Sequence, residues 1–138
     1  MVSTKIQFNE KLGKPYKICK DKDISALFKT GKKIYKFPYS SSYLIVDEKQ
    51  STPFQLVISV PKRNFKKAHD RNRIKRIIKE TFRKNKLILE TFLLEEQLQL
   101  SFFLMYNHKE KLTFEEFMLK TELFVYFLIE NLKNDSKI

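Results

Sequence analysis

Residues 59–83 have the sequence SVPKRNFKKAHDRNRIKRIIKETFR and contain the clearest helical pattern in the chain. From Asp70 to about Leu89, apolar and small side chains recur at helical spacing within one arc of about 140°. The residues of this arc are Ile74, Ile77, Ile78, Thr81 and Phe82. The pattern predicts an amphipathic helix whose apolar face packs in the core.

The adjoining arc of the same helix is cationic. It carries Arg71, Lys75, Arg76, Lys79 and Arg83, while Arg73 projects from the far side. Residues 62–86 contain 12 basic and 2 acidic residues, so this block contributes +10 of the net charge of +12. A single-sign field of this density attracts a polyanion and releases its counterions on contact. Nucleic acid is therefore the predicted partner, and a solvated basic face without a partner is the alternative.

The segments before this helix predict one short helix and several strands. In Asp21–Gly31 the apolar residues Ile24, Leu27 and Phe28 stand at helical spacing, an Asp begins the segment and a Gly ends it. Residues 33–46 are rich in β-branched and aromatic side chains and predict one or two strands, with a bulge or edge position between them. Residues 54–60, FQLVISV, predict a strand that Pro61 closes. The polar residues 47–53 predict a hairpin between these strand regions.

The segments after the helix predict a further strand and a last helix. In residues 98–106, LQLSFFLMY, the even-numbered side chains share one face of a strand. Thr113 and Glu116 have the spacing of a capping box, and an apolar-rich helix is predicted over residues 114–132. The predicted order is α-β-β-β-α-β-α, an α+β fold in which helices pack on a small sheet.

The composition agrees with one folded domain over residues 1–138, with residues 1–16 expected to be flexible and residues 134–138 to form a tail. With 42% hydrophobic residues and 13 Phe, the chain can build a core. The single Cys19 cannot form an internal disulfide or supply a multi-cysteine zinc site. The longest apolar run, Leu123–Ile129, is too short for a membrane span, and no export signal is visible at the start. A cytoplasmic location without membrane contact is expected.

A specific motif lies at the start of the cationic helix. Its Arg71-Asn72-Arg73, followed by Ile74-Lys75-Arg76, resembles the RNR signature of the bacterial ribonuclease P protein component, and the flanking Ser59-Val60, Lys62-Arg63 and Lys79-Glu80-x-Phe82-Arg83 fit the same family. Asp23-Ile24-x-x-Leu27-Phe28-x-x-Gly31 is similar to its first helix. Three features depart from the family pattern: Ile24 replaces a frequent aromatic, the loop with Phe65-Lys66-Lys67 is apparently one residue longer and lacks a glycine, and Met1–Tyr16 is unlike the usual lead-in.

The resemblance implies a fold and a function. The fold would be ribosomal protein S5 domain 2-like, with a left-handed crossover between parallel strands. The partners would be the ribonuclease P catalytic RNA and precursor tRNA, with neither DNA nor a membrane. The RNA subunit would perform the cleavage with Mg²⁺ that it mainly holds itself, and the protein would have no catalytic residues, no bound metal and no activity alone. The protein would bind the RNA and the 5′ leader of the precursor, aiding endonucleolytic removal of the leader.

Carried onto this sequence, the resemblance implies two sets of site residues. The RNA-binding set is Lys62, Arg63, Lys66, Lys67, Arg71, Asn72, Arg73, Lys75, Arg76, Lys79 and Arg83. The leader cleft would contain Phe28, Tyr43 and Ser59, although the spacing of Ile24 and Phe28 fits a core position equally well.

Two other functions are weighed against this one. An autonomous nuclease would need paired carboxylates or a histidine with a partner, whereas the basic block holds only Asp70 and Glu80, and His69 and His108 stand without neighbouring partners. Asp70 is predicted to be an N-cap. The main alternative is a general or ribosomal RNA-binding protein without a role in tRNA maturation, because small basic α+β domains are common in that class.

Overall fold

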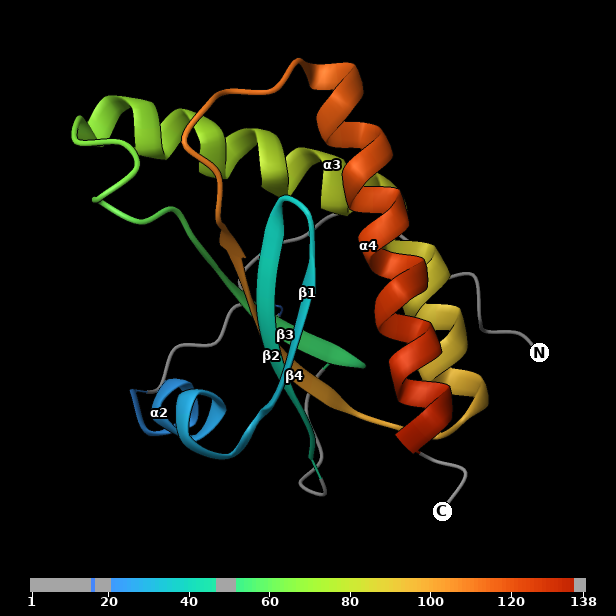
Figure 1. Ribbon diagram of the computed structural model, residues 1–138. Coiled ribbons are helices and arrows are strands. Elements are labelled where there is room, and N and C mark those ends of the chain that lie inside the picture. Colours follow the sequence, from blue (N-terminus) through green and yellow to red (C-terminus); the bar gives the residue numbers. More distant parts are fainter. Residues whose placement is uncertain (1–15, 17–20, 47–51, 136–138) are drawn as a thin grey trace.

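The computed structural model describes residues 16, 21–46 and 52–135. It confirms the predicted α+β order (Figure 1). The elements are α2 (Asp21–Thr30), β1 (Lys32–Lys36), β2 (Tyr39–Ile45), β3 (Phe54–Ser59), α3 (Ala68–Glu95), β4 (Leu100–Tyr106) and α4 (Phe114–Asp135). Residues 33–46 thus contain two strands, and Phe37 and Pro38 form the turn between them, joined by a cis peptide bond.

The four strands form one mixed sheet in the order β1-β2-β4-β3. β1 and β2 pair antiparallel, β2 and β4 pair antiparallel, and β3 and β4 pair parallel. The predicted hairpin between β2 and β3 is therefore wrong, because β4 lies between them. The seven residues of β4 include six buried ones, and a strand covered on both faces belongs in the middle of a sheet. The connection from β3 through α3 to β4 is the parallel crossover that the resemblance implies.

The main core lies between one face of the sheet and the helices α3 and α4, and Figure 1 shows α4 beside the second half of α3. The even-numbered residues of β4 contribute Leu100, Phe102, Leu104 and Tyr106 to it, as the alternation predicts. From α3, Ile74, Ile78 and Phe82 are buried as predicted, whereas Ile77 is only partly buried. The helix continues past the predicted end at Leu89 because Leu93 extends the same buried face.

The opposite face of the sheet is partly covered by α2. Leu27 of α2 is fully buried against Phe103 of β4, and Ile24, Leu44 and Met105 pack around this pair.

Gly31 follows α2 where the helix end approaches β2 closely. A Cβ atom at Gly31 would collide with the Ser42 Oγ of β2 and would lie 2.6 Å from the carbonyl oxygen of Leu27. The glycine that the sequence places here is therefore needed for close approach.

The helix ends confirm one predicted cap and correct another. Thr113 N donates to Glu116 Oε1 at 2.8 Å and Glu116 N donates to Thr113 Oγ1 at 3.1 Å, which is the predicted capping box. At α3 the N-cap residue is Lys67, and its side chain makes no capping bond. Asp70 lies inside the first turn, so the prediction that it is the N-cap is wrong, although a carboxylate still suits this turn.

The last turn of α4 replaces part of the predicted C-terminal tail. The helix includes residues 134 and 135, and the rest of the predicted tail lies outside the described residues. Asp135 accepts hydrogen bonds from Lys32 Nζ at 2.7 Å and from the Tyr43 hydroxyl at 2.5 Å. These bonds connect the end of α4 to β1 and β2. The predicted flexible segment 1–16 also lies outside the described residues, except for Tyr16.

A buried polar cluster joins Tyr16 to α3. The Lys86 and Glu90 side chains are each 2% exposed, and Lys86 Nζ lies 3.9 Å from Glu90 Oε1. The Tyr16 hydroxyl donates to Glu90 Oε2 at 2.6 Å and accepts from Lys86 Nζ at 3.1 Å. Burial raises the pKa of Glu90, while the Tyr16 hydrogen bond and the Lys86 charge oppose the rise. Removal of either charge from this buried pair would leave the other charge buried without its counter-charge, which would destabilise the fold.

Candidate nucleic-acid interface

The β3–α3 loop and the first half of α3 present a cationic surface. Nine of the predicted RNA-binding residues are exposed on it: Lys62, Arg63, Lys66, Lys67, Asn72, Arg73, Lys75, Arg76 and Lys79. We call these nine residues the cationic surface. The buried apolar face of α3 fixes the helix on the sheet, so the spacing of these charges is set before any ligand arrives. Arginine forks on a rigid helix suit bidentate contacts to phosphate.

Two of the predicted RNA-binding arginines have structural partners. Arg71 Nη1 donates to the carbonyl oxygens of Phe65 and Lys66, both at 2.8 Å, and thereby holds the loop before the helix. Arg83 forms an ion pair with Glu80, with 2.6 Å between Nη2 and Oε2. The hydrogen bond from Arg83 lowers the pKa of Glu80, so this carboxylate stays charged and offsets the arginine. These contacts correct the expectation that both arginines simply face outward.

Asp70, the other acidic residue of the basic block, also forms an ion pair. Lys111 Nζ donates to Asp70 Oδ1 at 3.1 Å and, with this hydrogen bond as the main cause, lowers the pKa of Asp70. The ion pair fastens the loop before α4 to the first turn of α3. Within the described residues, no group of three or more His, Cys, Asp or Glu side chains could hold a metal ion. In the same part of the chain, no helix is long and apolar enough to cross a membrane.

The sheet face beside α2 carries exposed aromatic rings. Phe28 of α2 is 50% exposed, and its ring stacks on Phe103 with 4.8 Å between centroids and 27° between planes. Tyr35 of β1 is 54% exposed and pairs with Ser40, on the side of the strands opposite the main core. Ser59 ends β3 on this same side, opposite Met105. We call the face formed by Phe28, Tyr35, Ser40, Ser59, Phe103 and Met105 the α2-side face.

The three predicted leader-cleft residues therefore do not lie on the same side of the sheet. Phe28 and Ser59 lie on the α2-side face, and Ile24 is partly buried beneath it. Tyr43 lies in the main core on the other side of the sheet and is 2% exposed, so its prediction as a cleft residue is wrong. Burial and the contact with Asp135 raise the pKa of Tyr43. Its partner Asp135 belongs to α4, which covers that side.

Sequence reasoning missed the two other aromatic members of the α2-side face, Tyr35 and Phe103, as well as Ser40 and Met105. Tyr35 and Phe103 could have been found from alternation, because each stands at an odd position in a strand whose even positions include core residues. The side to which those odd positions point follows only from the pairing of β4 with β2 and β3. The exposed Tyr35 is an aromatic that can stack on an unpaired base.

Solved structures share the fold of this chain. A ribonuclease P protein from Staphylococcus aureus superposes with a TM-score of 0.63 at 22% identity, covering 82% of this chain and 94% of that one. The ribonuclease P protein from Thermotoga maritima gives a TM-score of 0.50 at 22% identity, covering 81% of this chain and 86% of that one. At this level of identity the similarity establishes the α+β fold of these proteins.

Sequence comparison extends the relationship from fold to family. The family described as Ribonuclease P matches residues 12–125. The chain belongs to the ribonuclease P protein family. Ribonuclease P protein components from two strains of Porphyromonas gingivalis are each 33% identical over 76 residues, which cover 55% of this chain and 56% of the relative. The chain thus spans about half the length of the curated relatives it matches.

Proposed function

We propose that the chain is the protein subunit of ribonuclease P and aids removal of the 5′ leader from precursor tRNA. The observation that carries this proposal is that one chain presents both the cationic surface along α3 and the exposed aromatic rings of the α2-side face. A rigid row of cations suits a folded RNA, whereas exposed rings suit unpaired bases. One protein with both surfaces can contact a structured RNA and a single strand together.

The cationic surface is proposed to bind the catalytic RNA. Arg73, Lys75, Arg76 and Lys79 are exposed along α3, and none of them forms an ion pair with another described residue. Each can therefore replace a counterion on the RNA without first losing an intramolecular partner. Arg71 acts mainly by holding the loop that carries Lys66 and Lys67.

The α2-side face is proposed to hold the 5′ leader. Phe28 presents one face of its ring to solvent while the other rests on Phe103, which keeps the ring in place without covering it. Stacking on such a ring tolerates any base, and the leader differs between precursors. The chemistry is assigned to the RNA subunit, with Mg²⁺ held mainly by that RNA, because a strongly cationic protein surface disfavours a divalent cation.

The proposal is tested by cleavage of precursor tRNA at low millimolar Mg²⁺ and moderate salt, using the ribonuclease P RNA of the same organism with and without this protein. Protein-dependent formation of the mature 5′ end is expected. The protein alone, treated with ribonuclease, should not cleave. If the protein gives no enhancement while the RNA alone cleaves at high Mg²⁺, a general or ribosomal RNA-binding role takes its place.

A further inference from the structure

The second half of α3 exposes two leucines on one side of the helix. Leu87 and Leu94 are 47% and 46% exposed, and a spacing of seven residues places them in one row. α4 packs against a different side of α3, where the Thr81 hydroxyl shares a hydrogen bond of 2.9 Å with Thr121. We call Leu87 and Leu94, with the partly buried Thr91 between them, the outer row of α3.

Tyr16 is anchored on α3 beside this row. Its hydroxyl donates to Oε2 of Glu90, which lies one helical turn from each of the two leucines. The Tyr16 ring lies 4.3 Å from Lys86 Nζ and 5.0 Å from the ring of Phe54, measured to the ring centroids. These contacts fix residue 16 on the helix, so the segment of residues 1–15 is joined to the fold next to the outer row.

One carboxylate oxygen at this anchor lacks a hydrogen-bond donor. Glu90 Oε1 is buried and accepts no hydrogen bond from the described residues, although Lys86 Nζ lies 3.9 Å away. A buried acceptor without a donor is costly, and native folds rarely leave one. The residues that directly precede Tyr16 in the chain carry suitable donors, among them backbone N–H groups and the Lys14 ammonium group.

The sequence before Tyr16 has apolar side chains at alternating positions. In residues 1–16, MVSTKIQFNEKLGKPY, the apolar residues at even positions are Val2, Ile6, Phe8, Leu12 and Tyr16. An extended chain places such residues on one side, and Tyr16 already packs on α3. Four extended residues span about 13–14 Å, whereas Leu94 lies about 6 Å from Glu90 along the helix. The apolar side of the segment can therefore reach the outer row.

Charge favours this segment over RNA at the outer row. Residues 87–96 contain three glutamates, Glu90, Glu95 and Glu96, and no basic residue, so this end of α3 repels a phosphate backbone. Residues 1–15 contain three lysines and one glutamate, so their side chains carry a net charge of +2. The segment thus complements the outer row in both charge and apolar character.

We propose that residues 6–12 of this chain dock on the outer row of α3. The side chains of Ile6, Phe8 and Leu12 cover the two leucines of the row, and a donor from the residues that follow completes the hydrogen bonds of the buried carboxylate. Removal of apolar area from water drives the docking. The inference does not depend on the proposed function, because the outer row lies on the half of α3 beyond the cationic surface.

Paramagnetic broadening in the NMR spectrum of the full chain tests this placement. A nitroxide is attached at Glu95→Cys, an exposed position next to the outer row but outside it, after Cys19→Ser has removed the single natural thiol. The amide signals of residues 6–12 should be weakened several-fold, relative to the same protein with the nitroxide reduced.

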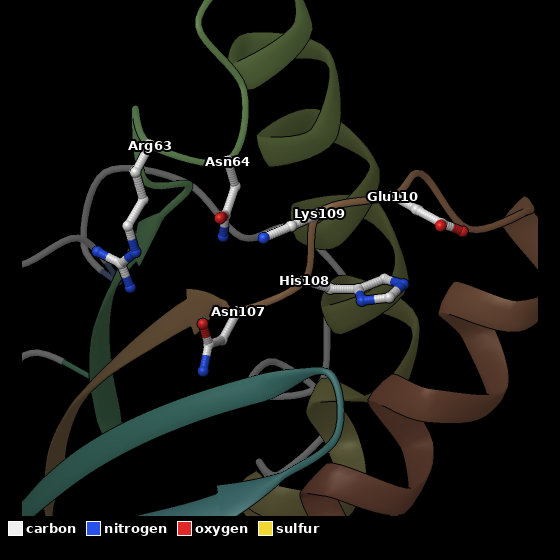
Figure 2. Close-up of a pocket in the computed structure, with 6 residues that line it drawn as sticks. All are labelled: Arg63, Asn64, Asn107, His108, Lys109 and Glu110. Atoms are coloured by element: carbon white, nitrogen blue, oxygen red, sulfur yellow. The ribbon is translucent and has the colours of Figure 1, made fainter.

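A nitroxide at Glu110→Cys is the control for position. Figure 2 shows Glu110 in the loop after β4, with its side chain directed away from Arg63. The next residue of this loop, Lys111, pairs with Asp70, which precedes Leu94 by about 36 Å along α3. This nitroxide should leave the signals of residues 6–12 unchanged.

Two pairs of substitutions separate docking on the outer row from proximity along the chain. Leu87→Gln with Leu94→Gln should abolish the broadening caused by the nitroxide at residue 95, because the apolar row is lost while the core stays filled. Leu119→Gln with Leu123→Gln is the matched control on α4, since these leucines are also about half exposed. The control pair should retain the broadening.

The inference is overturned if the nitroxide at residue 95 leaves residues 6–12 unaffected, or if the glutamine pair on α3 retains the full effect. A mixture of isotope-labelled chain without nitroxide and unlabelled chain with nitroxide detects contacts between molecules. Broadening in that mixture would show that the segment of a second copy covers the row, which also overturns docking within one chain. Cleavage of precursor tRNA tests the proposed function separately.

Discussion

The ring of Phe28 rests on the ring of Phe103, with 4.8 Å between centroids and 27° between planes, while half of the Phe28 side chain stays exposed. The helix α2 carries this ring and the strand β4 supports its inner face, while the outer face is exposed. A large aromatic that is half exposed contributes less to folding than a buried one, since less apolar area leaves water. The arrangement fits a platform for an unpaired base.

Phe28→Ala should therefore weaken binding of single-stranded leader RNA by about 1–3 kcal/mol, because one stacking contact is lost. Binding is measured with the holoenzyme and precursors with and without a leader, and the loss should occur only with the leader. Tyr126→Ala is the control, because Tyr126 is also 50% exposed but lies on α4. Equal effects of the two substitutions would show that Phe28 is not a leader contact.

Arg76 and Arg83 provide a matched pair on the cationic helix. Arg76 is exposed, whereas Arg83 is paired with Glu80. Arg76→Ala should weaken RNA affinity by about 1–3 kcal/mol if it contacts phosphate, and should reduce the salt dependence of binding. Arg83→Ala should weaken RNA affinity less, because the Glu80 carboxylate already offsets the charge of Arg83. An unchanged salt slope for Arg76→Ala would argue against a phosphate contact.

The buried pair of Lys86 and Glu90 predicts a pH-dependent stability. Burial is the main cause that raises the pKa of Glu90 above its ordinary value of 4.5. The folded state therefore binds the proton more tightly than the unfolded state. The stabilising contribution of protonated Glu90 to the free energy of unfolding is fully present below pH 4.5. It is lost as the pH rises through the higher pKa of the folded state.

Lys86→Met removes the cation from this pair and should cost about 3–5 kcal/mol of unfolding free energy at pH 7, because Glu90 is left buried without it. Part of the loss should be recovered at lower pH, where Glu90 is protonated. Urea unfolding between pH 4 and pH 8 measures both effects. Lys84→Met is the control at an exposed position, and a pH-independent loss for Lys86→Met would contradict the explanation.

Gln97 has a backbone strain that substitution can relieve. It follows α3 with φ of 56°, where non-glycine residues are disfavoured. Gln97 N donates to Leu94 O and Leu98 N donates to Leu93 O, which is the pattern of a Schellman cap. Gln97→Gly should stabilise the protein by about 0.5–1 kcal/mol, the strain relieved less the entropy of glycine.

Thermal unfolding checks this prediction, with Glu96→Gly as the control. Glu96 has φ of −88°, so a glycine there relieves nothing and should destabilise the protein. A lower melting temperature for Gln97→Gly would show that the Gln97 side chain contributes more than its backbone costs.

Local patterns predicted the helices well, because helical periodicity depends on residues close in sequence. Ile74, Ile78 and Phe82 define the buried face of α3 by their spacing alone, and the Thr113 cap needs only four residues. The strand order could not be predicted in the same way, because pairing of β3 with β4 joins segments separated by a 28-residue helix.

The part of the candidate site that lies on one helix could be predicted from the sequence. The part that depends on how the strands pair could not. The exposure of Arg76 follows from its place on the cationic arc, outside the apolar arc of the helix. Tyr43 and Phe28 looked alike in sequence, yet the register of β2 against β4 directs Tyr43 toward α4. Similarly, no local pattern indicates that Arg71 bonds the carbonyl oxygens of its own loop.

The central position of β4 has a consequence for synthesis of the chain on the ribosome. Among the described strands, β3 pairs only with β4, which is made after α3, so an emerging chain presents the cationic helix before its sheet is complete. Until residues 100–106 have left the ribosome, the apolar side of α3 lacks the central strand against which it packs. The nascent protein is therefore expected to gain a fixed row of cations only near the end of translation.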